Sequence, residues 1–199
     1  MRIICPHSCS RCPHVKDMKA ALEAGGIIVY RTDTLYALGA SIYSEEGLER
    51  LHALKGRPDS LPFSVAVGSV EDLPLVARPT EYEMDVILRL HPLPMTFVVT
   101  ARDDLHSYLV RDGKVGVRIL DNLCPAVLGP LTATSANIHG GETLTCIKEI
   151  KGIFGEGVSY YIDSGVSGDT PSTVYDITGK RIIRPGIVSE KVLEERLNG

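Results

Sequence analysis

Hydroxyl-bearing and charged side chains follow an apolar run early in the chain, in a pattern that could bind a small polar ligand. Residues 27–30 (IIVY) precede residues 31–39 (RTDTLYALG), where Thr32, Asp33 and Thr34 are three consecutive oxygen-bearing residues. Side chains at the carboxyl end of a strand commonly line a ligand crevice. The alternative is a turn in which these three side chains bond to their own backbone.

Positive charge stands where phosphate or carboxylate groups could be bound. Lys55 and Arg57 lie on a loop that Pro58 and Pro62 stiffen. A guanidinium fork and an ammonium point charge both suit phosphate oxygens. The alternative is that Lys55 and Arg57 stand at the carboxyl end of a helix, where the helix dipole favours cations. Arg118 stands between two apolar residues, so it needs an anionic partner, either an internal carboxylate or a ligand.

Three later motifs add hydroxyl, amide and guanidinium groups. They are TATSAN at residues 132–137, PSTVYD at residues 171–176 and RPG at residues 184–186. Together they suit a polar, anionic small molecule. The sequence has no Walker A, dinucleotide-binding, zinc-protease or serine-hydrolase motif. A phosphate site must therefore be built from separated segments.

The composition is that of an ordinary globular protein. The chain has 199 residues, of which 44% are hydrophobic and 23% charged, with a formal net charge of −4. These values exclude a disordered or fibrous protein and argue against nucleic-acid binding through overall positive charge. No apolar run approaches the about 18 residues of a membrane helix, and the first residues hold no signal-peptide core. We expect a soluble, cytoplasmic protein with no membrane partner.

Periodicity and capping signals predict helices and strands that mix along the chain. Helices are expected at residues 16–23, 44–54, 80–90, 145–154 and 189–197. Strands are expected at residues 27–30, 63–67, 96–100, 115–119, 131–134, 159–162, 173–177 and 181–184. Because strands and helices do not alternate strictly, we expect an α/β fold with a twisted mixed sheet and helices on both faces.

Six motifs in one order resemble the YrdC-type threonylcarbamoyl-AMP synthase family. They read TDTxYxLG, KxRPxxxP, VRI, SANxxG, STVxD and RPG, and the resemblance covers about residues 16–197. The length resembles the short, single-domain form of the family. Arg31, Ala37, Leu61 and Ala66 depart from its usual residues. The resemblance implies a three-layer α/β sandwich around a twisted mixed sheet, with the ligands in a concave positive cleft.

The resemblance also implies an activity. A nucleotidyltransferase of this family joins L-threonine, bicarbonate and ATP to give L-threonylcarbamoyladenylate and pyrophosphate, with Mg²⁺ accompanying ATP. The product serves the tRNA threonylcarbamoyl transferase machinery, and the positive cleft could contact tRNA. The residues carried over for threonine are Thr34, Arg118, Ala133, Thr134 and Ser172. The residues carried over for ATP are Lys55, Arg57, Ser135, Asn137, Thr143 and Arg184. No general acid or base is evident, so positioning should supply most of the rate.

Two other functions compete with this interpretation. An RNA-binding or regulatory module could keep the fold without making an adenylate, and steeply salt-dependent binding without pyrophosphate release would reveal it. A lyase or synthase acting on a phosphorylated sugar would want a cluster of acidic metal ligands. Asp33 is the only carboxylate in the matched motifs before Asp176, which counts against the sugar enzyme.

The start of the chain is rich in cysteine. Cys5, Cys9 and Cys12 have the spacing of a radical-SAM cluster, but the chain is too short for the barrel that holds such a cluster. With His7 or His14 the three thiolates complete a Cys₃His zinc set. The alternative is an N-terminal arm with free thiols.

The expected organisation is one catalytic domain over residues 16–199, preceded by a cysteine-rich arm over residues 1–15. Cys124 and Cys146 are the remaining cysteines. The odd number and uneven placement of the five cysteines are not typical of a disulfide framework.

Overall fold

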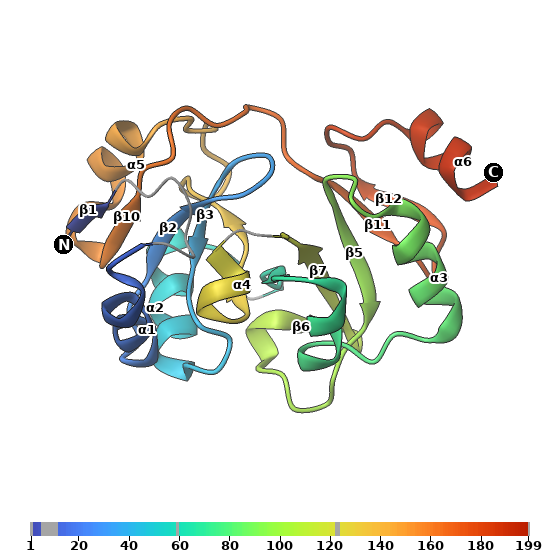
Figure 1. Cartoon of the computed structure of the whole chain (residues 1–199), viewed down its shortest axis with the longest axis horizontal. Coiled ribbons are helices and arrows are strands. Elements are labelled where there is room, and N and C mark those ends of the chain that lie inside the picture. Colours follow the sequence, from blue (N-terminus) through green and yellow to red (C-terminus); the bar gives the residue numbers. More distant parts are fainter. Residues whose placement is uncertain (1, 5–11, 59, 122–123, 199) are drawn as a thin grey trace.

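A computed structural model describes residues 2–4, 12–58, 60–121 and 124–198. Its strands and helices mix along the chain as the sequence predicts, and helices flank twisted mixed sheets (Figure 1). The predicted α/β fold class is thus confirmed. The strands form two sheets, where the sequence predicts one.

Six α-helices occur in the described residues, and five of them match predicted ones. They are α1 (Val15–Glu23), α2 (Glu45–Lys55), α3 (Glu81–Leu90), α4 (Cys124–Leu128), α5 (Ile147–Phe154) and α6 (Glu190–Asn198). The short helix α4 is the one that the sequence did not predict. Three 3₁₀ helices, at Val70–Leu75, Ser107–Leu109 and Gly155–Gly157, link other elements. None of the described helices is long and apolar enough to cross a membrane.

The first sheet has five strands in the order β1-β10-β2-β3-β9. Their bounds are Arg2–Ile4, Tyr160–Ile162, Ile28–Arg31, Tyr36–Gly39 and Thr134–Ser135, in that order. The first three strands are mutually parallel, and β3 is antiparallel to both β2 and β9. Strand β1 comes from the segment expected to be an arm, so the backbone of residues 2–4 belongs to the sheet.

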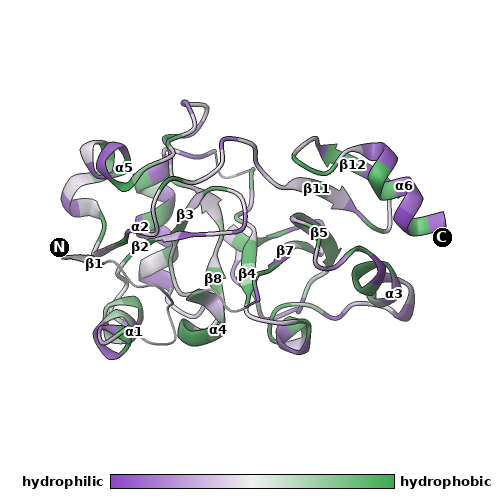
Figure 2. Ribbon diagram, turned by 45° about the horizontal axis from the view of Figure 1, so that its top comes forward, coloured by the Kyte–Doolittle hydropathy of each residue, from purple (hydrophilic) through white to green (hydrophobic). Residues whose placement is uncertain are grey.

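The second sheet has seven strands. Its main path runs β12 (Arg181–Arg184), β11 (Thr173–Asp176), β5 (Met95–Thr100), β7 (Lys114–Ile119), β4 (Val65–Val67) and β8 (Leu131–Thr132), while β6 (Val110–Arg111) pairs with β7. Figure 1 shows α3 and α6 at this end of the molecule and α1, α2 and α5 at the other. Strands β4 and β5 are largely hydrophobic (Figure 2), and one buried apolar cluster includes residues of both sheets.

The two sheets meet at Thr132 and Ala133. The predicted strand at residues 131–134 is two short strands, because β8 pairs with β4 in the second sheet and β9 pairs with β3 in the first. The Tyr30 hydroxyl donates to the Thr132 carbonyl oxygen at 3.0 Å. The Thr132 hydroxyl in turn accepts from the Ala40 backbone N–H at 2.9 Å. These bonds bring the ends of strands from both sheets together.

Glu83 links α3 to the second sheet. It is buried, with 2% of its surface exposed, and it completes the predicted capping box with Thr80. Its Oε2 accepts from the Thr80 N–H at 2.8 Å, and its Oε1 accepts from the Thr100 N–H at 3.0 Å. One carboxylate therefore satisfies a helix end and a strand end together.

Replacing Glu83 by alanine should destabilise the fold. Glu83→Ala removes two hydrogen bonds to a buried carboxylate, from the N–H groups of Thr80 and Thr100, so the free energy of unfolding should fall by about 3 kcal/mol. Chemical denaturation followed by circular dichroism measures this change. The matched control is Glu81→Ala, an exposed glutamate in the same helical turn. Equal stability of the two variants would contradict the linking role.

Candidate active site

A cavity of about 170 Å³ lies where the two sheets meet. It is lined by all the residues that the family resemblance assigns to ligands except Lys55 and Asn137. These lining residues are Thr34, Arg57, Arg118, Ala133, Thr134, Ser135, Thr143, Ser172 and Arg184. Segments more than a hundred residues apart in sequence thus form one site. We call it the first cavity.

The turn between β2 and β3 forms one wall of the first cavity. The Thr32 hydroxyl donates to the Leu35 carbonyl oxygen at 2.7 Å and accepts from the Leu35 N–H at 3.1 Å. The Thr34 carbonyl oxygen accepts from the Gly168 N–H at 3.0 Å. The turn alternative is therefore confirmed for Thr32, which bonds its own turn. Thr32 and Thr34 also line the cavity, and their binding of a ligand stays a prediction.

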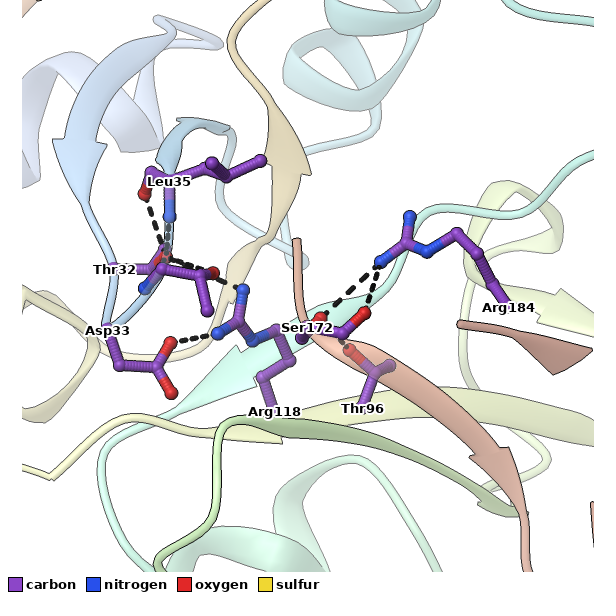
Figure 3. A network of polar contacts seen from close by, with 8 residues as sticks. Thr32, Asp33, Leu35, Thr96, Arg118, Ser172 and Arg184 are labelled. Carbon is purple, nitrogen blue, oxygen red and sulfur yellow. Dashed lines mark hydrogen bonds and ion pairs between the residues drawn. The ribbon is translucent and has the colours of Figure 1, made fainter. Parts of the chain in front are cut away.

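Arg118 lies at the centre of the site, on β7. Its guanidinium forms an ion pair with Asp33 and lies 3.5 Å from the Thr32 hydroxyl (Figure 3). Its side chain is 7% exposed, and its buried Nε has no hydrogen-bond partner among the described residues. Burial, with a smaller contribution from Arg184, lowers the pKa of Arg118 to about 10. Of the two anionic partners that the sequence allows, the internal carboxylate is present, and the guanidinium keeps N–H donors, Nε among them, that no described residue uses.

Ser172 and Arg184 form the opposite wall. The hydroxyls of Ser172 and Thr96 are 2.9 Å apart, and Arg184 Nη2 donates to the Ser172 carbonyl oxygen at 2.9 Å (Figure 3). A side chain at Gly186 would place its Cβ 2.4 Å from the Pro171 carbonyl oxygen. The glycine of the RPG motif thus lets the chain after β12 pack against the segment that holds Ser172.

Arg57 shapes its own loop. Its Nε donates to the Leu61 carbonyl oxygen at 2.8 Å, its Nη2 donates to the Pro62 carbonyl oxygen at 3.0 Å, and its guanidinium lies 5.3 Å from the centre of the Phe63 ring. Burial, and then the nearby charge of Arg184, lowers the pKa of Arg57. Two guanidinium groups are held close enough to repel, which favours an anion between them.

Lys55 and Asn137 do not line the first cavity, but both contact Ser135, which does. Lys55 is buried, with 2% of its surface exposed. Its ammonium donates to the carbonyl oxygens of Ser135 and Asn137 and to Asn137 Oδ1. The structure thus holds both residues near the site, but neither lines the cavity.

A second, larger cavity of about 830 Å³ adjoins the first, with Arg57, Ser64 and Arg184 lining both. Its wall adds three further cations, the carboxylates of Asp112 and Asp176, and several apolar side chains. The cations are Arg111, Lys114 and Arg181, and the apolar residues include Leu61, Phe63, Val98, Val174, Ile182 and Ile183. Lys114 is paired with Asp176, Nζ to Oδ1, at 2.8 Å.

Sequence reasoning missed two lining residues. Ser64 and Thr96 line the first cavity, but no spacing or motif marks either of them. Both stand among apolar residues in or beside strands that read as core. Their hydroxyls face the cavity because of the sheet arrangement, which a single sequence does not display.

The departures from the family pattern have structural consequences. Arg31 Nη1 donates to the Ser164 carbonyl oxygen at 2.7 Å, which fastens the segment that crosses from β10 to β11 (Figure 1). Leu61 contacts Arg57 through its carbonyl oxygen, which any residue provides. Ala66 is fully buried beside Arg118 in the β4–β7 pairing. Ala37 lines the first cavity.

The predicted zinc ligands are only partly described. Cys5, His7 and Cys9 lie outside the described residues. Cys12 is a buried free thiol, and His14 Nδ1 lies 3.7 Å from Asp17 Oδ2. The zinc site therefore stays a prediction. Cys124 is disulfide-bonded, which the cysteine spacing did not indicate.

Comparisons with known proteins agree with the motifs. The family model Sua5/YciO/YrdC, described as telomere recombination, matches residues 20–186. The threonylcarbamoyl-AMP synthase of Mus musculus is 33% identical over 187 residues, covering 86% of this chain and 66% of that protein. The threonylcarbamoyl-AMP synthase of Pseudoalteromonas translucida is 30% identical over 173 residues, covering 82% of this chain and 92% of that protein.

Solved structures share the fold. Sua5 of P. abyssi, crystallised with L-threonine, superposes with a TM-score of 0.85 at 24% identity, covering 99% of this chain and 61% of that one. E. coli YciO superposes with a TM-score of 0.82 at 23% identity, covering 96% of each chain. The match to the family model spans most of the chain, and the motifs that carry it converge on one cavity. The chain belongs to the Sua5/YciO/YrdC family.

Proposed function

We propose that this protein is a threonylcarbamoyl-AMP synthase, a nucleotidyltransferase that makes L-threonylcarbamoyladenylate and pyrophosphate from L-threonine, bicarbonate and ATP. The observation that carries the proposal is the convergence of the separated motifs on the first cavity. Relatives at 30% and 33% identity that are named threonylcarbamoyl-AMP synthases support it.

The first cavity suits threonine. Arg118 is a cation that lines the first cavity, and its Nη1 and Nη2 each have an N–H beyond those that meet Thr32 and Asp33, so it can bind the substrate carboxylate. Thr34 and Ser172 line the first cavity on opposite walls, and their hydroxyls can bond the threonine hydroxyl or amine. Selection of threonine would combine such a hydrogen bond with an apolar contact to the methyl group, from Ala133 or Leu35.

The nucleotide fits across the two cavities. Arg57 and Arg184 line both cavities, which supports a role for these two cations in binding the phosphates between the reacting end and the nucleoside. The apolar side chains of the second cavity suit a base, and its cations suit phosphate or ribose oxygens. We therefore assign Arg57, Arg184, Ser135 and Thr143 to ATP.

Mg²⁺ accompanies ATP in this proposal. The side chains that line the first cavity offer hydroxyl and guanidinium groups and no carboxylate. That donor set fits a Mg²⁺ ion carried by phosphate oxygens and water rather than by a protein cage. The ion would neutralise phosphate charge, and the arginines would bind the oxygens that it leaves free.

The chemistry needs positioning more than proton transfer. The threonine nitrogen forms a bond to the bicarbonate carbon with loss of water, and a carbamate oxygen then attacks the α-phosphorus while pyrophosphate leaves. Among the described residues that line the first cavity there is no aspartate, glutamate or histidine, so no side chain there is an evident general base. Fixed cations offset the repulsion between anionic reactants and hold them in line.

The product would serve a tRNA threonylcarbamoyl transferase, in keeping with a cytoplasmic role in tRNA modification. Contact with tRNA itself through the cationic wall of the second cavity belongs to the same proposal. Bicarbonate as a substrate and the transferase as a partner follow from the proposed activity.

Labelled substrate tests the proposal directly. The purified chain is incubated with ATP, Mg²⁺, L-threonine and ¹⁴C-bicarbonate, and the products are separated for a labelled adenylate and for pyrophosphate. We expect label linked to AMP with threonine, and much less with serine or valine. Absence of the adenylate, or equal label with all three amino acids, rejects the specific activity. Salt-dependent RNA binding without pyrophosphate release would favour a binding module.

A further inference from the structure

We propose that Lys55 is a positioning residue, whose ammonium holds the segment of residues 135–139 in place and does not contact the nucleotide. This inference rests on the proposed synthase activity and reassigns the lysine of the KxRP motif. The segment begins at Ser135, the last residue of β9, which lines the first cavity. Lys55 would then act on the substrate through Ser135.

The donors of Lys55 are all used. A lysine ammonium has three N–H donors and no acceptor. Nζ lies 2.5 Å from the Ser135 carbonyl oxygen, 2.6 Å from the Asn137 carbonyl oxygen and 2.8 Å from Asn137 Oδ1. Three short bonds consume three donors, so none is left for a phosphate oxygen.

The location of Lys55 also separates it from the ligands. Only 2% of its surface is exposed, although it stands at the end of a helix. Arg57 lines both cavities, whereas Lys55 lines neither. The carbonyl end of the helix and the three oxygen acceptors stabilise the charged ammonium. Burial and the nearby charge of Arg57 act in the opposite direction and lower the pKa of Lys55 to about 7.

The backbone of Lys55 holds the same segment. Its carbonyl oxygen accepts from the His139 N–H at 3.1 Å, so both ends of the residue bind the segment. The Ser135 hydroxyl donates to Asn137 Oδ1 at 2.7 Å, and Asn137 Nδ2 donates to the Gly141 carbonyl oxygen at 2.7 Å. The network runs from Lys55 through Ser135 and Asn137 towards Thr143, the other lining residue of this region.

Chemical labelling separates a positioning lysine from a phosphate-binding one. The full chain is treated with an amine-reactive N-hydroxysuccinimide ester, with and without ATP and Mg²⁺, and each lysine is read by mass spectrometry. We expect Lys55 to stay unlabelled in both conditions, while Lys191, whose side chain is 84% exposed, is labelled in both. Labelling of Lys55 in the free protein that ATP then blocks overturns the proposal. This measurement requires no turnover, so it is readable even if the synthase activity is absent.

Kinetics test the action through Ser135. Lys55→Met keeps an unbranched side chain as far as Cε and removes the ammonium donors, and we expect kcat/KM for ATP to fall about 100-fold because the segment shifts. Lys55→Met combined with Ser135→Ala should be no worse than the slower single variant. Losses that multiply in the double variant would show an independent contact of Lys55 with the substrate and overturn the proposal. Lys191→Met, on the exposed side of α6, is the matched control and should retain full activity.

Discussion

Arg118→Met is expected to abolish threonine-dependent pyrophosphate release at ordinary threonine concentrations while costing little stability. Arg118 is the buried cation of the first cavity, and the charged bonds it offers a carboxylate are worth up to about 3 kcal/mol. Their loss corresponds to roughly a 100-fold rise in the KM for threonine. Initial rates over a range of threonine concentrations, with ATP saturating, measure this change.

Stability should respond asymmetrically to the two partners of this ion pair. The Asp33 side chain is 32% exposed and the Arg118 side chain is 7% exposed. Arg118→Met therefore leaves a carboxylate that water can reach, whereas Asp33→Ala leaves a buried guanidinium without a counter-ion, which costs about 3 kcal/mol or more. Denaturant titration of the two variants should rank Asp33→Ala as the less stable.

A surface ion pair provides the control. Arg102 and Asp104 form a bond of 2.7 Å with both side chains exposed, so Arg102→Met and Asp104→Ala should each change stability by about 1 kcal/mol or less. They should leave the KM for threonine unchanged. If Arg118→Met binds threonine as the wild type does, the carboxylate has another partner and the assignment of Arg118 is wrong.

Sequence reasoning succeeded where the signal was local. The capping box at Thr80 and Glu83 and the cap at Ser44 are confirmed, since each cap satisfies backbone groups within a few residues of itself. Most predicted strands match for the same reason, because their apolar runs are bounded by turn residues. The six motifs also contain most of the residues that line the first cavity.

The failures concern long-range pairing. The sequence predicts no strand at residues 36–39 and indicates only a ligand-lining segment there. In the structure these residues form β3, which pairs with β2 and β9. The change of sheet at Ala133 depends on which strands lie on either side, and the burial of Lys55 depends on a segment 80 residues away. No local sequence pattern indicates such contacts. The motif therefore assigns Lys55 to ATP, whereas in the structure its ammonium donates to Ser135 and Asn137.

Arg57→Ala should abolish adenylate formation and leave the protein folded. Arg57 lines both cavities, and after its bonds to Leu61 and Pro62 its remaining guanidinium face can bind phosphate oxygens. An anion between Arg57 and Arg184 would offset the repulsion between them. Removing a preorganised donor of this kind lowers the rate about 1000-fold. The free energy of unfolding should change little, because the variant loses two half-exposed hydrogen bonds but also removes the repulsion with Arg184.

The comparison of Arg57→Ala with Arg57→Lys separates charge from geometry. Lysine restores a point charge but not the fork that reaches Leu61, Pro62 and a phosphate together, so it should recover only a small part of the rate. Pyrophosphate release and a far-UV circular dichroism spectrum are measured for both variants, with Arg78→Ala, an exposed arginine paired with Asp103, as the control. Full activity of Arg57→Lys would show that Arg57 contributes only its positive charge and not the geometry of its guanidinium. Normal activity in folded Arg57→Ala would remove Arg57 from the site, and the phosphates would then depend on Arg184 and the cations of the second cavity.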